Sequence, residues 1–368
     1  MSDNRNRRRD ARWLAGVAGV AAVGSVAGAS VARSVRRRGG VDDPYAGEDF
    51  TVLDADRGCV VTATDGVPLA VREVGPADAR LTVVFAHGFC NCMGSFHFQR
   101  ARLAEQWGDQ VRMVFYDQRG HGQSAAGPVD SYNIGQLGQD LESVLRVMVP
   151  RGPVILVGHS MGGMTVLAHA RQFPHRYPSR ICGVAIIASA AQGVSRSPVG
   201  SVLRNPAVEA VKAAVRFAPV TVGRGRGAAR SVLSPILKAA SFGDMRVSPS
   251  VVAYAEKMIN TTSMRTTVEF LHALEVHDEA GALPVLAKVP SLIACGDRDL
   301  LTPLAKSEAM ARQLPKSELL VAEGAGHMVH MEQPELINDA LVRLVERAAP
   351  SRLVALSRRL LEKGRGNG

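Results

Sequence analysis

The chain has 368 residues, of which 46% are hydrophobic and 21% are charged. This composition excludes an intrinsically disordered protein. It allows one large hydrophobic core, or a core with a subdomain. Its net charge of +10 lies at the two ends: nine Arg and two Asp give residues 1–40 a charge of +7, and four Arg, one Lys and one Glu give residues 350–368 a charge of +4. Residues 41–349 are left with −1, so no nucleic-acid partner is expected.

Residues 1–50 are predicted to be a basic N-terminal segment that precedes the folded body. Within it, residues 13–32 carry no charge and are numerous enough to span a bilayer. We expect them to act as an anchor that associates the protein with a membrane. Removal as an export signal, or a helix docked on a cytoplasmic protein, are the alternatives. The polar residues 39–58, which include Gly, Pro and several Asp, are predicted to be a linker.

Residues 51–189 are predicted to form the first part of a core, and residues 283–349 its second part. Strand patterns occur at 59–64, 69–74, 81–86, 111–116, 154–157, 181–188, 291–295 and 318–322, and helical patterns at 134–148, 164–172 and 334–346. The first two strands are expected to pair antiparallel across a turn at Asp65-Gly66. The strand at 81–86 is an unbroken apolar run, and from there on apolar strands alternate with helical segments, which predicts a mostly parallel sheet with helices on both faces.

Residues 190–282 interrupt this alternation. The segment is helical in pattern, contains Arg-rich turns and has no convincing strand. We predict a helical lid inserted after the sixth strand, with a separate small helical domain as the alternative. Residues 350–368 are predicted to be a basic C-terminal tail, either a solvated terminal helix or a helix that lies on an anionic surface.

The run GHSMGG at residues 158–163 follows an apolar strand pattern and precedes a helical one. A strand, a sharp turn and a helix with Ser at the apex form the context of a nucleophile elbow. Small neighbours such as Gly158 and Gly162 let the strand and the helix pass closely. The helix dipole at this point favours developing negative charge. Ser160 is therefore the predicted nucleophile.

A serine nucleophile needs a base, and the base needs an orienting carboxylate. Both are expected at the carboxyl ends of later strands. There the chain has Asp297 and Asp299 after the strand at 291–295, and His327 after the strand at 318–322. The chain order Ser, Asp, His is the order expected for this architecture. Either aspartate is a candidate for the carboxylate that orients His327.

These features, together with His87-Gly88 and the run DQRGHGQS at 117–124, resemble the serine hydrolases of the α/β-hydrolase superfamily. The resemblance is to the lidded branch that includes esterases, lipases, proline iminopeptidases and cofactor-free haloperoxidases, and it covers residues 60–346. It implies an eight-stranded, mostly parallel α/β-hydrolase sheet, with no cofactor and no metal.

The resemblance also implies roles for individual residues. Ser160 would be the nucleophile and His327 the general base, and the family's usual Gly-x-x-Asp form selects Asp299 as the acid rather than Asp297. An oxyanion hole would be formed by the backbone N–H groups of Phe89 and Met161. Other polar residues nearby are interpreted as structural or packing groups: His87, His159, His330, Arg119 and His121.

We expect a hydrolase that cleaves small-molecule carboxylic esters, with an apolar or lipid-like acyl group, through an acyl-enzyme. The same triad also cleaves amides or peptides and supports cofactor-free peroxidation, so these activities are alternatives, as is a membrane-tethered binding protein without turnover. A serine at the nucleophile position argues against haloalkane dehalogenases and epoxide hydrolases of the same fold. Substrate-binding residues and the oligomeric state are left unassigned.

Overall fold

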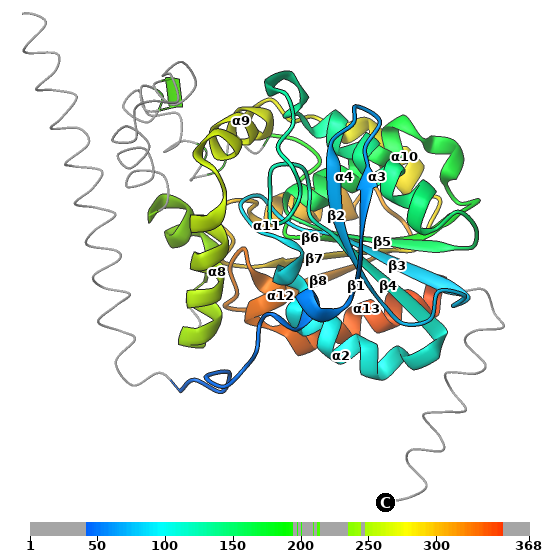
Figure 1. The fold of residues 1–368 in the computed structure, drawn as a ribbon, viewed down its shortest axis with the longest axis horizontal. Coiled ribbons are helices and arrows are strands. Elements are labelled where there is room, and N and C mark those ends of the chain that lie inside the picture. Colours follow the sequence, from blue (N-terminus) through cyan, green and yellow to red (C-terminus); the bar gives the residue numbers. More distant parts are fainter. Residues whose placement is uncertain are drawn as a thin grey trace, which may run out of the picture.

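A computed structural model of the chain describes residues 42–193, 197, 200, 209, 212–213, 235–243 and 247–348 (Figure 1). The predicted anchor at 13–32, the tail at 350–368 and most of residues 194–234 lie outside the described residues, so membrane association stays a prediction. Within the part of the chain that the structure describes, no helix is both long and apolar enough to cross a bilayer.

Eight strands form one sheet at the centre of the fold. They are β1 (Arg57–Thr62), β2 (Pro68–Val74), β3 (Leu81–Ala86), β4 (Val111–Tyr116), β5 (Val154–His159), β6 (Ile181–Ile187), β7 (Ser291–Gly296) and β8 (Ser317–Ala322). Their order is β1-β2-β4-β3-β5-β6-β7-β8. β1 pairs antiparallel with β2, and β2 with β4, while all other neighbours are parallel. The predicted mostly parallel sheet and its antiparallel opening are confirmed.

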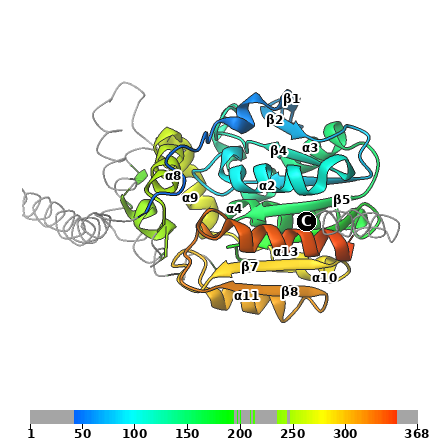
Figure 2. The same ribbon diagram turned by 90° about the horizontal axis from the view of Figure 1, so that it is seen from below.

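Helices cover both faces of this sheet (Figures 1 and 2). The α-helices are α2 (His97–Trp107), α3 (Ile134–Met148), α4 (Met161–Gln172), α8 (Pro249–Thr261), α9 (Met264–Glu275), α10 (Leu283–Leu286), α11 (Leu304–Ala311), α12 (Val329–Glu332) and α13 (Pro334–Ala348). α3, α4, α10 and α11 pack on one face, and α2 and α13 on the other. β3, β4 and β5 are buried along their whole length, so each face needs its own helical layer.

The structure describes α8 and α9 within the predicted lid at 190–282. Both helices lie at one end of the sheet, apart from the two helical layers (Figures 1 and 2). A β-bridge between Gln192 and Asp278 closes the base of this insert, and the Glu279 N–H donates to the carbonyl of Ala191 at 2.8 Å. α9 packs against the start of α4, and α8 packs beside α12. The insert therefore covers loops that follow core strands.

Residues 42–56, predicted to belong to a linker, are instead packed on the body. The Tyr45 ring lies 4.7 Å from the Phe98 ring of α2, centroid to centroid, and Phe50 stacks at 4.6 Å on Tyr254 of α8. The sequence did not predict these contacts of the linker with the body. Its local composition is polar, and the aromatic partners come from helices that lie far away in the sequence.

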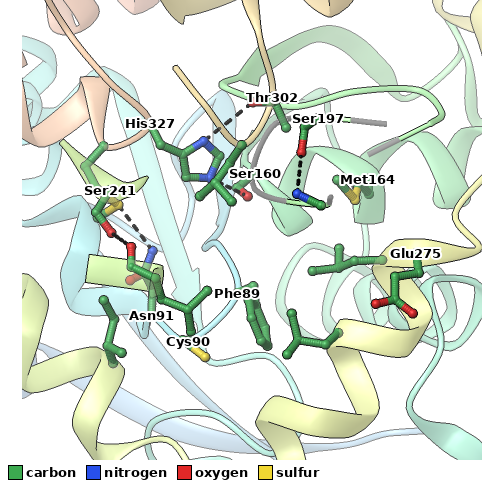
Figure 3. Close-up of a pocket in the computed structure, with 17 residues that line it drawn as sticks. Phe89, Cys90, Asn91, Ser160, Met164, Ser197, Ser241, Glu275, Thr302 and His327 are labelled. Carbon is green, nitrogen blue, oxygen red and sulfur yellow. Dashed lines mark hydrogen bonds between the residues drawn. The ribbon is translucent and has the colours of Figure 1, made fainter. Parts of the chain in front are cut away.

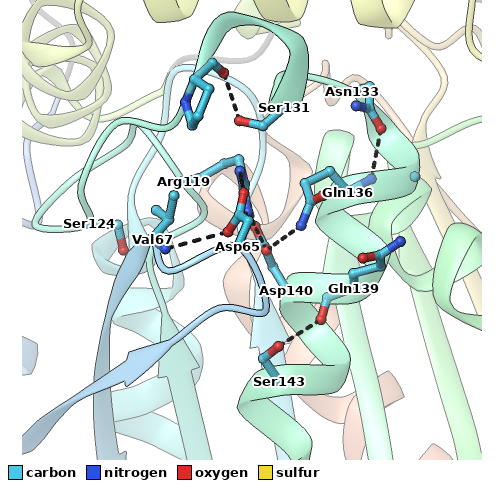
Figure 4. A network of polar contacts seen from close by, with 12 residues as sticks. Asp65, Val67, Arg119, Ser124, Ser131, Asn133, Gln136, Gln139, Asp140 and Ser143 are labelled. Atoms are coloured by element: carbon cyan, nitrogen blue, oxygen red, sulfur yellow. Dashed lines mark hydrogen bonds and ion pairs between the residues drawn. The ribbon is translucent and has the colours of Figure 1, made fainter.

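Arg119 links separate parts of the core (Figure 4). Its fully buried guanidinium contacts both carboxylate oxygens of Asp140, on α3, at 2.6 Å. It also contacts those of Asp65, in the turn between β1 and β2, at 2.7 and 3.1 Å. Burial raises the pKa of Asp140, whereas the hydrogen bonds from Arg119 lower the pKa of Asp65. These contacts agree with the interpretation of Arg119 as a structural residue.

Replacing Arg119 with leucine is expected to lower the free energy of unfolding by about 3–5 kcal/mol, because Asp140 would become a buried, unpaired charge. Urea denaturation at pH 7 measures the change. The control Arg102→Leu removes an arginine whose ion pair with Glu105 is exposed, and we expect a change below about 0.5 kcal/mol. Arg119→Lys, which keeps one positive charge, should lie between them. Equal stability of Arg119→Leu and wild type would contradict this role.

Candidate active site

Ser160 lies at the apex of the turn between β5 and α4, with φ +52° and ψ −117°. A non-glycine residue with positive φ is strained and must be held by its surroundings. Here the Ser160 N–H donates to the carbonyl of Ile187 at 2.8 Å, and the hydroxyl of Ser189 donates to the carbonyl of Ser160 at 2.7 Å. A Cβ atom at Gly162 would lie 1.9 Å from the carbonyl oxygen of Ala86, so the turn requires glycine there.

The structure brings Ser160, His327 and Asp299 together from three loops. Ser160 follows β5, Asp299 follows β7 and His327 follows β8. His327 Nε2 lies 2.8 Å from Ser160 Oγ, and His327 Nδ1 lies 2.8 Å from Asp299 Oδ2. Figure 3 shows the imidazole directed toward Ser160. An acceptor at Nε2 and a carboxylate at Nδ1 form the arrangement that takes a proton from a serine hydroxyl.

Four hydrogen bonds orient the Asp299 carboxylate. Oδ1 accepts from the N–H groups of Leu301 and Thr302, both at 2.8 Å, and Oδ2 accepts from the Thr302 hydroxyl at 2.8 Å as well as from His327. The other candidate, Asp297, points elsewhere: its Oδ1 accepts from the Gly324 N–H at 2.7 Å, and its side chain is 30% exposed. Of the two aspartates, the structure places Asp299 beside the histidine.

The two predicted oxyanion donors are a residue that directly follows Ser160 and a residue that lines its pocket. Met161 is the first residue of α4, where backbone N–H groups have no partner within the helix. Phe89 lies in the loop after β3 and lines the same pocket as Ser160. Among the described residues, neither N–H group has a hydrogen-bond partner. Their role as oxyanion donors stays a prediction.

His121 holds the loop that carries Phe89. The N–H of Cys90, which has a φ of +57°, donates to His121 Nε2 at 3.2 Å, and His121 Nδ1 lies 3.1 Å from the carbonyl of Arg119. Burial lowers the pKa of His121 to about 4, so the ring is neutral and Nε2 is an acceptor. Burial likewise raises the pKa of the Cys90 thiol to about 12, which keeps it protonated.

The remaining histidines near the site support its backbone. His87 Nδ1 donates to the carbonyl of Gly88 at 2.7 Å, and His87 Nε2 accepts from the Gln118 N–H at 2.9 Å. His159 Nε2 donates to the carbonyl of His327 at 2.9 Å. The fully buried His330 packs on His159 with ring centroids 4.1 Å apart, so it is a packing residue and not a surface one. Burial lowers the pKa of His330 to about 3.

A largely apolar pocket opens beside Ser160 (Figure 3). Its apolar lining includes Met164, Leu237, Ile259, Leu271, Leu274 and Met328. Polar side chains are fewer, and one of them, Glu275, is paired with Lys212 at 2.6 Å. The sequence did not identify these residues, because most of them come from the insert and carry no motif. Among the described residues, no cluster of three or more His, Cys, Asp or Glu side chains is arranged to hold a metal ion.

Comparisons with known proteins agree with this architecture. The chain is 26% identical to a proline iminopeptidase of Pestalotiopsis fici over 74% of its own length and 94% of that protein. It is 25% identical to an sn-1-specific diacylglycerol lipase of Mus musculus over 72% and 81% of the two chains. A solved thermophilic esterase from Thermogutta terrifontis superposes with a TM-score of 0.65 at 25% identity, covering 80% of this chain and all of the esterase.

The family model for the alpha/beta hydrolase fold matches residues 82–334. This range contains Ser160, Asp299 and His327 and every strand from β4 to β8. The match covers more than half of the chain, and the sheet, the elbow and the order of the three polar residues along the chain agree with it. The chain belongs to the alpha/beta-hydrolase family.

Proposed function

We propose that the protein hydrolyses carboxylic esters through an acyl-enzyme, with Ser160 as nucleophile, His327 as general base and Asp299 as the orienting acid. The observation that carries this proposal is the pair of 2.8 Å hydrogen bonds that joins Ser160 to His327 and His327 to Asp299. A protein that only binds a ligand has no physical need for all three groups in this order.

The proposed reaction begins when Ser160 Oγ attacks the ester carbonyl and its proton passes to His327 Nε2. The carbonyl oxygen becomes an oxyanion, which accepts hydrogen bonds from the N–H groups of Phe89 and Met161. Asp299 stabilises the imidazolium. His327 then gives the proton to the leaving alkoxide, which departs as an alcohol. Water, deprotonated by His327, attacks the acyl-enzyme, and breakdown of that second tetrahedral intermediate releases the acid and regenerates Ser160.

An apolar acyl group fits the pocket best. The side chains beside Ser160 are mostly aliphatic or thioether groups, among them Met164, Leu237 and Leu271, and burial of apolar substrate surface against them is favourable. Two of the similar proteins described above are named a lipase and an esterase. Amide cleavage is the second candidate, because a similar protein is named a proline iminopeptidase and the same three residues serve both reactions.

Labelling with a fluorophosphonate probe, followed by peptide mass spectrometry, tests the proposal. We expect the adduct on Ser160 in the wild-type protein and none at this position in Ser160→Ala. Ser241→Ala is the matched control, because Ser241 lines the same pocket but donates its hydroxyl to the carbonyl of Leu237 at 2.8 Å. This variant should be labelled like wild type. A folded wild-type protein without adduct would favour the binding-protein alternative.

Turnover of acyl esters of graded length, of matched amides and of a peroxidase substrate then separates the alternatives. We expect the highest kcat/KM for an ester with an apolar acyl chain. A higher kcat/KM for an amide or for peroxidation would overturn the ester assignment and leave the roles of Ser160 and His327 in place.

A further inference from the structure

The loop that carries His327 is joined to a segment of the insert, residues 235–243, which we call the cap segment. The N–H of Met328 donates to the carbonyl of Ser241 at 2.9 Å. Glu332, on α12, supplies the other contacts: Oε2 accepts from the N–H of Gly243 and Oε1 from the N–H of Gly326, each at 2.9 Å. One carboxylate therefore bridges two backbones that are about 80 residues apart in the sequence.

The two backbones at this junction are in direct contact. A Cβ atom on Gly243 would lie 2.3 Å from the carbonyl oxygen of Gly324, and one on Gly326 would lie 2.3 Å from the nitrogen of Gly243. No side chain fits between them. The cap segment can therefore stay packed against the loop that carries His327 only while the two main-chain segments keep this alignment. The Glu332 carboxylate hydrogen-bonds to both segments.

Both ends of this bridge lead to the active site. Gly326 immediately precedes His327, whose Nε2 must stay within hydrogen-bond distance of Ser160. On the other side, Leu237 and Ser241 of the cap segment line the pocket. The position of the cap segment and the position of the base are thus coupled through hydrogen bonds to one partly buried side chain.

We propose that Glu332 is a positioning residue that ties the cap segment to the histidine loop and so holds His327 in reach of Ser160. The inference rests on the proposed function, because it assigns Glu332 an effect on the base used in that reaction. Glu332 itself bonds to backbone and does not reach the reacting atoms.

The charge state of Glu332 matters for this role. An ionised carboxylate accepts both N–H bonds, whereas a protonated one presents a hydroxyl in place of one acceptor. Burial raises the pKa of Glu332 to about 7, while the hydrogen bonds from the N–H groups of Gly243 and Gly326 oppose this shift. The folded chain therefore holds this proton more tightly than the unfolded chain does. The free energy of unfolding therefore falls as pH rises from the usual pKa of a glutamate to about 7. Over the same pH range Glu332 ionises and can accept both N–H hydrogen bonds.

Glu332→Gln tests the proposal, because glutamine keeps the shape and resembles the protonated acid. At pH 8 we expect kcat/KM for the best ester to fall roughly 10- to 100-fold, since small displacements of a catalytic group have effects of this size. The Tm at pH 8 should be no lower than that of wild type. In the wild type, protonation of Glu332 contributes to the loss of kcat/KM as pH falls; the variant lacks this titrating group, so the acid limb of its pH profile should be shallower.

Glu142→Gln is the matched control. Glu142 is buried and, like Glu332, hydrogen-bonded through its carboxylate, to His169 at 3.1 Å and to Arg176, but it lies on α3 away from the pocket. We expect a lower Tm for this variant, with kcat/KM per folded molecule and the pH profile unchanged. A lower Tm for Glu332→Gln with a wild-type pH profile and wild-type kcat/KM would show a purely structural role and overturn the proposal.

Hydrogen exchange gives a readout that does not depend on turnover. Peptides covering 235–243 and 324–328 should both exchange faster in Glu332→Gln than in wild type, and neither should change in Glu142→Gln. Gly243→Ala places a Cβ atom between the same two main-chain segments and so separates them. The double variant Gly243→Ala with Glu332→Gln should therefore lose little more kcat/KM than the worse single variant. Unchanged exchange in both segments would overturn the coupling. Failure of ester turnover in wild type, with coupled exchange, would instead reject only the proposed function.

Discussion

Ser160→Ala is expected to lower kcat for the best ester substrate by roughly 10⁴- to 10⁶-fold, because no other group stands at the position that attacks the carbonyl. Ser160 Oγ lies 2.8 Å from His327 Nε2, and removing it leaves a base without a nucleophile. KM should change little, because the apolar pocket and the backbone donors stay in place. Steady-state kinetics on the purified full-length chain measures both parameters.

His327→Ala should lower kcat to a similar degree. The double variant should have a kcat no lower than that of the worse single variant, because the two groups act as one unit. If the effects of Ser160→Ala and His327→Ala multiplied instead, the two residues would not share one proton-transfer step. Full turnover by Ser160→Ala would reject the mechanism altogether.

Asp299→Asn is expected to lower kcat by about 10⁴-fold while leaving the fold intact. The asparagine oxygen would keep the hydrogen bonds from the N–H groups of Leu301 and Thr302, which now reach Oδ1 at 2.8 Å. Its amide NH₂ would then face His327 Nδ1 as a donor. That nitrogen would have to accept, so the ring proton would move to Nε2 and point at Ser160. A protonated Nε2 cannot take the serine proton.

Asp297→Asn is the control, because it changes an aspartate two residues away that bonds to the Gly324 N–H and not to His327. We expect its kcat to stay within about twofold of wild type. Steady-state kinetics over pH 6–9 compares the two variants. A loss of activity in Asp297→Asn equal to that in Asp299→Asn would reject the assignment of the orienting acid.

The parallel strands of the core were predictable to the residue in some cases. β3 and β4 are buried on both faces, so each is mainly apolar and its ends show in the sequence. α4 was predicted to begin at residue 164, but it begins at Met161. Gly162 and Gly163 are weak helix formers, yet Gly162 packs directly on the carbonyl of Ala86 and Gly163 on Ser189, and this tertiary packing outweighs helix propensity there.

The candidate site was predictable where a residue's function depends on its place after a strand. Ser160, Asp299 and His327 each follow a parallel strand, and parallel strands end at the same edge of the sheet, so their proximity followed from chain order. The sequence alone left Asp297 and Asp299 open. Two residues of separation in a turn send the two carboxylates in different directions, and only the folded loop shows which one meets the histidine.

The amino-acid sequence by itself determined the family, the sheet, and the places of Ser160 and His327 at its carboxyl edge, because these depend on local patterns along the chain. The tertiary structure decided the pocket lining, the packing of residues 42–56 and the junction at Glu332. Each of these joins segments of irregular pattern that lie far apart in the chain, such as Gly243 and Gly326. Contacts of this kind depend on how surfaces fit, and no periodicity or motif records that fit.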